Sequence, residues 1–315
     1  LHKAIRRQRQ MCIRDSIGIY RAAKTLNKKA YIVIDNPTSS IIPLMNTFRD
    51  NQDYEADMFV NNHEAKEIMD DNTLLVVVDT NKPSITQCED LLYMAKMIVV
   101  LDHHRQGSDT IRNSVLSYIE PYASSASEMV AEILQYFTEG IRIRNVEADS
   151  IYAGIMIDTD NFMQKTGVRT FEAAAFLRRC GADVTRVRKL FREDMNDYKA
   201  RGETIRNAEL FRGQFAISEC PSDYVDSPTV VGAQAANELL NIVGVKASFV
   251  LTEYKGVIYI SARAIDEVNV QIIMERMGGG GHLNMAGCQL ETVDLEGARS
   301  LLKSTLTEMQ DGGEI

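Results

Sequence analysis

Three apolar runs in this chain each stop at an aspartate. Residues 74–78 (LLVVV) lead into Asp79, residues 97–101 (MIVVL) into Asp102, and residues 151–157 (IYAGIMI) into Asp158. Short apolar runs are typical of buried parallel strands, and ligands of open α/β sheets bind at the carboxyl ends of such strands. The sequence therefore predicts three carboxylates at one edge of one sheet.

Two histidines, His103 and His104, directly follow Asp102. Clustered carboxylates repel one another unless a cation lies among them. Carboxylates and imidazoles together suit a divalent metal pair such as Mn²⁺. Taken alone, Asp102 could cap a turn and the histidines could be polar loop residues. The repetition of aspartates at matching strand ends favours a metal site instead.

A run of four glycines at 278–281 leads into His282. Glycine lets the backbone approach a ligand closely and aim its N–H groups at it. A flexible linker or a long turn after a helix would be the alternatives, but the adjoining histidine favours a binding loop. Ser261 and Arg263 lie on the preceding strand-like run and offer a hydroxyl and a phosphate-binding guanidinium. On its own, Arg263 is equally well explained as a surface strand residue.

Length and composition restrict the classes of protein. The 315 residues suffice for two ordinary domains, and 45% apolar with 25% charged residues is typical of a globular chain. The net charge of −9 argues against a protein that coats DNA, while leaving room for a small phosphorylated substrate. No apolar run is long enough to span a bilayer, and the five scattered cysteines indicate reduced thiols in the cytoplasm.

The elements that must position these residues alternate between strands and helices up to about residue 183. We expect a strand at 30–35, a helix at 84–97, a helix at 126–138 opened by a Ser125–Glu128 capping box, and a helix capped by Thr170 that ends near Gly181. Alternation on this scale predicts an α/β fold with a doubly wound parallel sheet.

The remainder of the chain has a different pattern. Residues 183–212 are rich in charge and predict connecting helices. From about residue 213, β-rich segments at 215–220, 248–254 and 257–265 accompany helical patterns at 230–242 and 270–277, which predicts a smaller α+β domain. We expect the acidic tail after Thr307 to be frayed.

In these motifs the chain resembles the DHH phosphoesterase superfamily with its DHH-associated domain, and most closely the cyclic-di-AMP phosphodiesterases of the GdpP (YybT) type. The resemblance runs from about residue 17 to about residue 302. The motifs that carry it are VVVDTNKP (76–83), VLDHHR (100–105), YAGIMIDTDNF (152–162), TGVRTFEAA (166–174), SAR (261–263) and NVQIIMERMGGGGHLNMAG (269–287).

The resemblance implies a role for each candidate residue. Two Mn²⁺ ions would share Asp79 and Asp158, and His103 would bind one of them. His104 would contact the substrate phosphate, and Asp102 would orient the site. The implied reaction is attack of metal-activated water on cyclic-di-AMP, giving linear pApA. In the second domain, the residues expected to bind the nucleotide, together with His104, are Ser261, Arg263, Gly279, Gly280, Gly281 and His282.

One departure from the family pattern concerns the first metal-binding motif, H-x-x-x-D-x-D-S-I-G. Here Asp15 matches its last aspartate, as a further metal ligand, whereas Arg9 and Ile13 stand at the positions of the histidine and the first aspartate. We interpret residues 1–15 as non-native sequence. Since two ligands are missing, we expect one metal position to be weak and turnover to be reduced.

The implied organisation is a DHH domain at 1–190, a helical linker at 191–212 and a DHH-associated substrate-binding domain at 213–315. Full-length relatives of this type are anchored in the membrane with this part in the cytoplasm, and a homodimer is a further expectation from the resemblance. Two alternatives remain: a nanoRNA or nucleotide phosphate hydrolase of the same superfamily, and a nucleotide-binding module with impaired catalysis.

Overall fold

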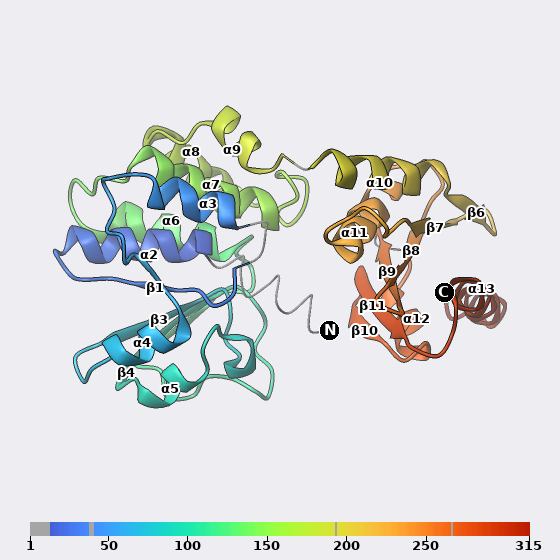
Figure 1. Cartoon of the computed structure of the whole chain (residues 1–315), viewed down its shortest axis with the longest axis horizontal. Coiled ribbons are helices and arrows are strands. Elements are labelled where there is room, and N and C mark those ends of the chain that lie inside the picture. Colours follow the sequence, from blue (N-terminus) through green and yellow to red (C-terminus); the bar gives the residue numbers. More distant parts are fainter. Residues whose placement is uncertain (1–12, 38–40, 193, 266) are drawn as a thin grey trace. The chain divides into compact units, whose positions relative to one another are not determined.

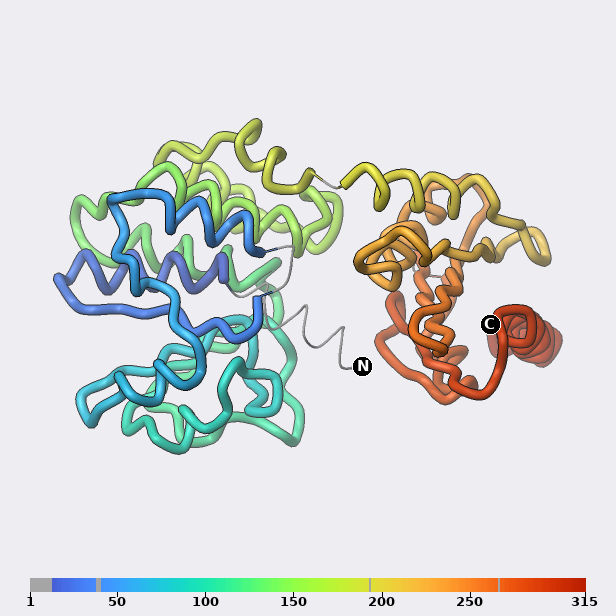
Figure 2. The backbone as a smooth tube through the Cα atoms, in the orientation of Figure 1, coloured from blue at the N-terminus to red at the C-terminus, as the bar shows by residue number. Residues whose placement is uncertain are grey.

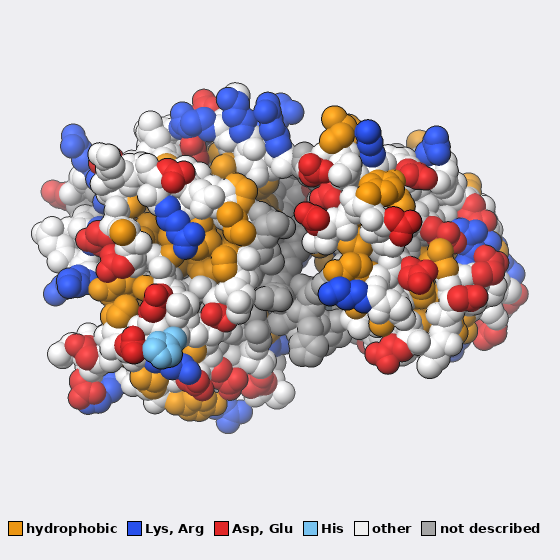
Figure 3. Space-filling view, viewed as in Figure 1, with side chains coloured by type: hydrophobic (Ala, Val, Ile, Leu, Met, Phe, Trp, Pro, Cys, Tyr) orange, Lys and Arg blue, Asp and Glu red, His pale blue; other side chains and the backbone are white. Residues whose placement is uncertain are grey.

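The computed structural model describes residues 13–37, 41–192, 194–265 and 267–315, and it divides after Arg192 into two compact units (Figure 1). The chain passes from the first unit to the second once, between α9 and α10 (Figure 2). On the face shown in Figure 3, acidic and basic side chains are interspersed on each unit. No helix among the described residues is long and apolar enough to cross a membrane.

The first unit has two parallel sheets, one formed by β1 and β2 and the other by β3, β4 and β5 in that order. Its strands are β1 (Ile32–Val33), β2 (Phe59–Val60), β3 (Leu74–Val78), β4 (Met97–Asp102) and β5 (Leu116–Ile119). Its helices are α2 (Ile13–Thr25), α3 (Ile42–Arg49), α4 (Asn62–Ile68), η1 (Pro83–Ile85), α5 (Asp90–Met94), α6 (Ala126–Phe137), α7 (Asn145–Asp158), α8 (Val168–Arg179) and α9 (Val184–Leu190).

Helices cover both faces of the β3-β4-β5 sheet. Val78 and Leu101 pack into the core shared with α6, α7 and α8, whereas Val77 and Val100 pack with α5 on the opposite face. Neighbouring residues of one strand point to opposite faces, so a strand buried on both sides reads as a continuous apolar run. The predicted doubly wound α/β architecture is confirmed, and Figure 1 shows the helices on either side of β3 and β4.

The second unit is built on one mixed sheet in the order β10-β11-β9-β8-β7-β6, in which only β7 and β8 are parallel. Its strands are β6 (Glu209–Phe211), β7 (Phe215–Cys220), β8 (Ala247–Tyr254), β9 (Val257–Ala264), β10 (Gly280–His282) and β11 (Met285–Leu290). Its helices are α10 (Met195–Arg206), α11 (Pro228–Leu239), α12 (Val270–Arg276) and α13 (Leu295–Asp311). The predicted smaller α+β domain is therefore confirmed.

One apolar core of this unit lies between the sheet and α12 and α13, and another lies between the sheet and α11. The segment predicted as a linker, 191–212, contains α10, which packs on α11 and β7 of the same unit.

Several sequence expectations are wrong. The run at 151–157 belongs to helix α7 and is not a strand. All residues from Glu147 to Met156 are buried, and a helix that is apolar on every side lacks the 3.6-residue period that would distinguish it from a buried strand. The tail after Thr307 is not frayed, because α13 continues to Asp311 and buries Met309.

Element boundaries also differ from the expectations. The predicted strand at 30–35 is reduced to Ile32–Val33, and the predicted helix at 84–97 consists of η1 and the short α5. Thr170 does not cap α8 but lies in its first turn, where its hydroxyl accepts the N–H of the N-cap residue Gly167. Ser125 does cap α6, as predicted, by accepting the N–H of Glu128. The reciprocal bond of the predicted capping box differs, because the Glu128 side chain accepts the N–H of Ser124 and not that of Ser125.

Candidate functional site

Two neighbouring parallel strands carry the first part of the site. Asp79 follows β3 and Asp102 ends β4, and the N–H of Asp79 donates to the carbonyl of Leu101 at 2.9 Å. Asp79 has a φ of +61°, a left-handed conformation that is uncommon for a residue other than glycine. Such strain persists where the surroundings demand it, often at functional sites. The sequence correctly predicted these side chains at one sheet edge.

Asp79, His103 and His104 each offer a ligand atom within 4.8 Å of the others. Nε2 of His103 lies 3.3 Å from Oδ1 of Asp79. Burial of His103 disfavours its charged form, but the hydrogen bond and the charge of Asp79, with the charges of Asp158 and Asp102, outweigh burial and raise the pKa of His103 to about 9.

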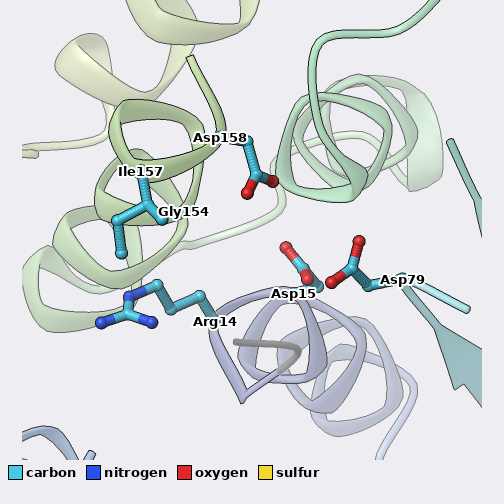
Figure 4. A pocket seen from close by; sticks show the side chains of 6 residues that line it. All are labelled: Arg14, Asp15, Asp79, Gly154, Ile157 and Asp158. Atoms are coloured by element: carbon cyan, nitrogen blue, oxygen red, sulfur yellow. The ribbon is translucent and has the colours of Figure 1, made fainter. Parts of the chain in front are cut away.

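Two helices bring Asp15 and Asp158 to Asp79. Asp15 comes from the first turn of α2 and Asp158 from the last residue of α7, and Figure 4 shows the three carboxylates facing one another beside the Arg14 side chain. Burial first, and then the charge of Asp79, raises the pKa of Asp158 to about 7. The same two causes raise the pKa of Asp15 well above its usual range.

Asp102 is fully buried and holds His104. Oδ1 of Asp102 accepts from Nδ1 of His104 at 2.7 Å and from the backbone N–H of His104 at 3.1 Å. Burial alone would raise the pKa of Asp102, but the bonds from His104 and from Asn81 outweigh burial and lower it. The His104 side chain is 40% exposed, and Asp102 holds the ring through its Nδ1.

In the second unit, the candidate residues lie in rows across three strands. Ser261 on β9 pairs with Gly287 on β11, which pairs with Gly280 on β10. In the next row, Arg263 pairs with Met285, which pairs with His282. Directly opposed residues point to the same face of a sheet, as do residues two apart on one strand.

These rows lie on the face opposite the α12 and α13 core. Ala262, Ala286 and Cys288 point into that core, whereas Ser261 and Arg263 are half-buried on the other face. Gly287 and Gly280 continue the row of Ser261 without side chains, whereas in the next row the exposed Met285 lies between Arg263 and His282. The structure thus brings Ser261, Arg263, Gly280 and His282 together on one face.

The consecutive glycines differ from one another in their surroundings. A Cβ at Gly279 would lie 2.2 Å from the carbonyl oxygen of Gly287, and a Cβ at Gly281 would lie 2.4 Å from Cα of Ala286. A Cβ at Gly280 would meet nothing within 4 Å. Packing of β10 against β11 therefore requires Gly279 and Gly281, but it does not require Gly280.

Comparison with known proteins follows the same division. Residues 12–155 match the DHH family, N-terminal domain, and residues 215–308 match the DHHA1 domain. The chain belongs to the DHH family. The candidate metal ligands, apart from Asp158, and the candidate face of the second unit all fall within these two matched domains.

The chain is 41% identical over 304 residues to the cyclic-di-AMP phosphodiesterase GdpP of Bacillus subtilis (strain 168), covering 95% of this chain and 46% of that protein. It is 38% identical over 297 residues to the cyclic-di-AMP phosphodiesterase PdeA of Listeria monocytogenes serotype 1/2a (strain 10403S), covering 93% and 45%. The chain thus spans less than half the length of these relatives. The solved structure of an exopolyphosphatase-related protein from Bacteroides fragilis shares the fold, with a TM-score of 0.79, 20% identity and coverage of 95% and 88%.

Two polar residues of the DHH domain contact candidate site residues and were not predicted from the sequence. Asn81 is buried and donates from Nδ2 to Oδ2 of Asp102. The hydroxyl of Ser127 on α6 donates to Asp15. Asn81 lies within the VVVDTNKP motif, so its proximity to Asp79 was a usable signal. Nothing in the local sequence distinguishes Ser127.

The donor set of the DHH domain fits divalent cations. Asp15 and Asp79 are buried, and the half-buried Asp158 lies beside them. Burial and the charge of Asp79 raise the pKa values of Asp15 and Asp158, so the protein alone compensates their negative charges poorly. A bound cation would compensate them. Carboxylates combined with the imidazole of His103 are ligands that Mn²⁺ accepts.

Proposed function

We propose that this chain is a metal-dependent phosphodiesterase that hydrolyses cyclic-di-AMP to pApA. The observation that carries the proposal is the convergence of Asp79, His103 and His104, whose ligand atoms lie within 4.8 Å of one another, with Asp15 and Asp158 beside them. It is supported by the similarity to GdpP and PdeA, which are named cyclic-di-AMP phosphodiesterases.

Asp15, Asp79, His103 and Asp158 are the proposed metal ligands, and Mn²⁺ is the proposed cofactor. The solved structure of exonuclease RecJ bound to manganese shares the fold at a TM-score of 0.50 and 12% identity, covering 94% of this chain and 87% of that one. Bound divalent ions would lower the pKa of a water molecule and neutralise charge on phosphoryl oxygens. Asp79 lies between the other carboxylates and His103, which suits it for contact with two ions.

His104 is the proposed group that contacts the substrate phosphate. Asp102 accepts from Nδ1 and thereby fixes the orientation of the ring. In the imidazolium form of His104, Nε2 is also a donor. A donor held in place in this way stabilises charge that develops on a phosphoryl oxygen without having to reorient during the reaction. Asp102 acts here through His104 and does not touch the substrate itself.

In the DHHA1 domain, we propose that the face carrying Ser261, Arg263 and Gly280 binds the nucleotide, with His282 beside it. A glycine floor lets a flat base or a sugar approach the backbone. The Arg263 guanidinium suits a phosphate, and the Ser261 hydroxyl suits a polar group of the nucleotide. Gly279 and Gly281 serve this face by holding β10 against β11.

The weak metal position expected from the sequence remains part of the proposal. Ile13 stands where the family has its first aspartate, and it packs in an apolar core at the start of α2. Arg9 lies outside the described residues. A site with one ligand fewer at this place would hold one Mn²⁺ less tightly. Arg14 lines the same pocket and its charge lowers the pKa of Asp158, which partly compensates the carboxylates.

A second candidate function is hydrolysis of short oligoribonucleotides or of a nucleotide phosphate. It is favoured by the 25% identity over 311 residues with the bifunctional oligoribonuclease and PAP phosphatase NrnA of Thermus thermophilus, which covers 96% of this chain and 88% of that protein. The metal site does not separate the two functions, because the same groups would serve either substrate.

The test is hydrolysis of cyclic-di-AMP by the purified chain with Mn²⁺, with pApA and AMP resolved by chromatography. Conversion of cyclic-di-AMP to pApA without AMP supports the proposal. If the chain leaves cyclic-di-AMP intact but releases AMP when pApA is supplied as the substrate, the second candidate is supported. Binding of cyclic-di-AMP without turnover would identify a nucleotide-binding module with impaired catalysis. Restoring an H-x-x-x-D-x-D segment upstream of Ser16 should then revive hydrolysis.

A further inference from the structure

Glu128 on α6 is a buried carboxylate, 1% exposed, that the proposed mechanism does not use. Its Oε2 accepts three hydrogen bonds: from the Ser124 N–H at 3.3 Å, from the Ser124 hydroxyl at 2.5 Å and from the Thr170 hydroxyl at 2.6 Å. Oε1 lies no closer than 4.0 Å to its nearest cation, Nε of Arg169. One oxygen therefore joins two segments that are distant in sequence.

The first of these segments leads to His103. Ser124 follows Ala123, whose carbonyl lies 3.4 Å from Nδ1 of His103. With this carbonyl as acceptor, a proton is held at Nδ1 of His103, and Nε2 is directed at Asp79. Because a carbonyl at 3.4 Å is at the outer limit of a hydrogen bond, a small displacement of this segment would break the contact.

The second segment leads back to Asp158. Between Asp158 and α8 the chain passes through four non-glycine residues with positive φ, namely Asp160, Asn161, Phe162 and Lys165. Local preferences do not favour this path, so it must be fixed at its ends. Thr159 fixes the start through bonds with the Ile155 carbonyl and the Phe162 N–H. Thr170, bonded to both Gly167 and Glu128, fixes the other end.

We propose that Glu128 is a positioning residue with two effects. Through Ser124 it sets the orientation of His103, and through Thr170 it fixes the path of the chain that follows Asp158. The inference rests on the proposed metal site, since it concerns two of its ligands. Because the donors converge on one oxygen, what matters is an acceptor at that place and not the negative charge. A glutamine, which keeps an acceptor oxygen, should therefore replace Glu128, whereas an alanine should not.

The experiment compares Glu128→Gln, Glu128→Ala and the control Glu132→Ala. Glu132 lies one turn further along α6 and pairs with Arg169, the neighbour of Thr170, at 2.6 Å. Its loss removes a carboxylate from the same helix and an ion pair beside the second segment, but it leaves the hydrogen bonds to Glu128 in place. The readouts are the Mn²⁺ dissociation constant from calorimetry and the His103 Nδ1–H resonance of the metal-free protein.

We expect Glu128→Ala to weaken Mn²⁺ binding by about 10- to 100-fold, as is typical when a partner of a metal ligand is lost. The Nδ1 proton should exchange with solvent, so that its resonance broadens or disappears. Glu128→Gln should keep the affinity within about threefold, below that range, and retain the resonance. Glu132→Ala should leave both readouts unchanged.

An unchanged affinity and resonance in folded Glu128→Ala would overturn the inference, and so would a Glu128→Gln variant as impaired as the alanine. If Glu128→Ala does not fold, Ser124→Ala removes only the hydroxyl link on the His103 side and should still expose the Nδ1–H. If the unaltered chain binds no Mn²⁺, the proposed function fails, whereas the resonance of the metal-free protein still tests the positioning role.

Discussion

The four adjacent glycines of the DHHA1 domain provide the sharpest test, because the structure assigns different roles to neighbours of the same residue type. In Gly279→Ala, the new methyl would lie 2.2 Å from the Gly287 carbonyl oxygen and 2.4 Å from Cβ of Cys288. The first of these is backbone of the adjacent strand, so no side-chain rotation relieves the overlap. Overpacking of this kind costs about 1–3 kcal/mol, and we expect the free energy of unfolding to fall by the upper end of that range.

Gly280→Ala should behave in the opposite way. Its backbone does not have a positive φ, and its Cβ would lie in open space. Replacing glycine under these conditions stabilises a protein by about 0.4–1 kcal/mol, because the unfolded chain loses freedom. The same methyl would protrude from the proposed floor for the nucleotide. If it displaces the ligand at an overpacking cost of about 1–3 kcal/mol, the affinity for cyclic-di-AMP falls by about 5- to 150-fold.

The assay combines urea unfolding, followed by far-UV circular dichroism, with calorimetric binding of cyclic-di-AMP. Gly202→Ala is the matched control, because it adds a methyl in open space on helix α10, away from the sheet face. It should stabilise by up to about 1 kcal/mol and leave binding unchanged. Undiminished binding by Gly280→Ala would refute the glycine floor. Undiminished stability of Gly279→Ala would refute the packing argument.

Three further predictions concern the DHH domain. The metal-free protein should lose stability as the pH rises. The pKa of Asp158 is raised to about 7 from 3.8, so its stabilising contribution is lost between about pH 4 and 7. The pKa of His103 is raised to about 9 from 6.5, so its contribution is lost between about pH 6.5 and 9. Mn²⁺ should abolish this trend in thermal unfolding, and a stability that rises over this pH range would contradict the pKa shifts. His104→Asn should lower kcat by about 10²- to 10³-fold and retain the affinity for Mn²⁺. His103→Asn should lower the affinity for Mn²⁺ by more than about 10- to 100-fold, the loss typical when only a residue that holds a metal ligand is removed. Equal effects of the two variants on kcat and on affinity would show that the roles are misassigned. Calorimetric titration should find one tight Mn²⁺ site and a second, weaker one, and two equally tight sites would show that the ligands missing at Arg9 and Ile13 are not needed.

The sequence by itself determined the part of the site that depends on neighbours in the chain. Asp79 and Asp102 follow short apolar runs, and parallel pairing of β3 with β4 brings the ends of the two strands together. His103 and His104 are adjacent to Asp102, so their place was set by the same strand. The two-domain division and the open glycine face also have local signals, in the change of element pattern and in the glycine run.

Only the tertiary structure decided which distant groups complete the site. Asp158 ends a helix and not a strand, because α7 is buried on every side and its sequence carries no helical period. Ser127 bonds to Asp15, and Glu128 joins Ser124 to Thr170, through packing of α6 against α2 and α8. Likewise, only the contacts of β10 with β11 separate Gly279 from Gly280. Interactions between residues far apart in sequence depend on the whole packed core, which no local pattern encodes.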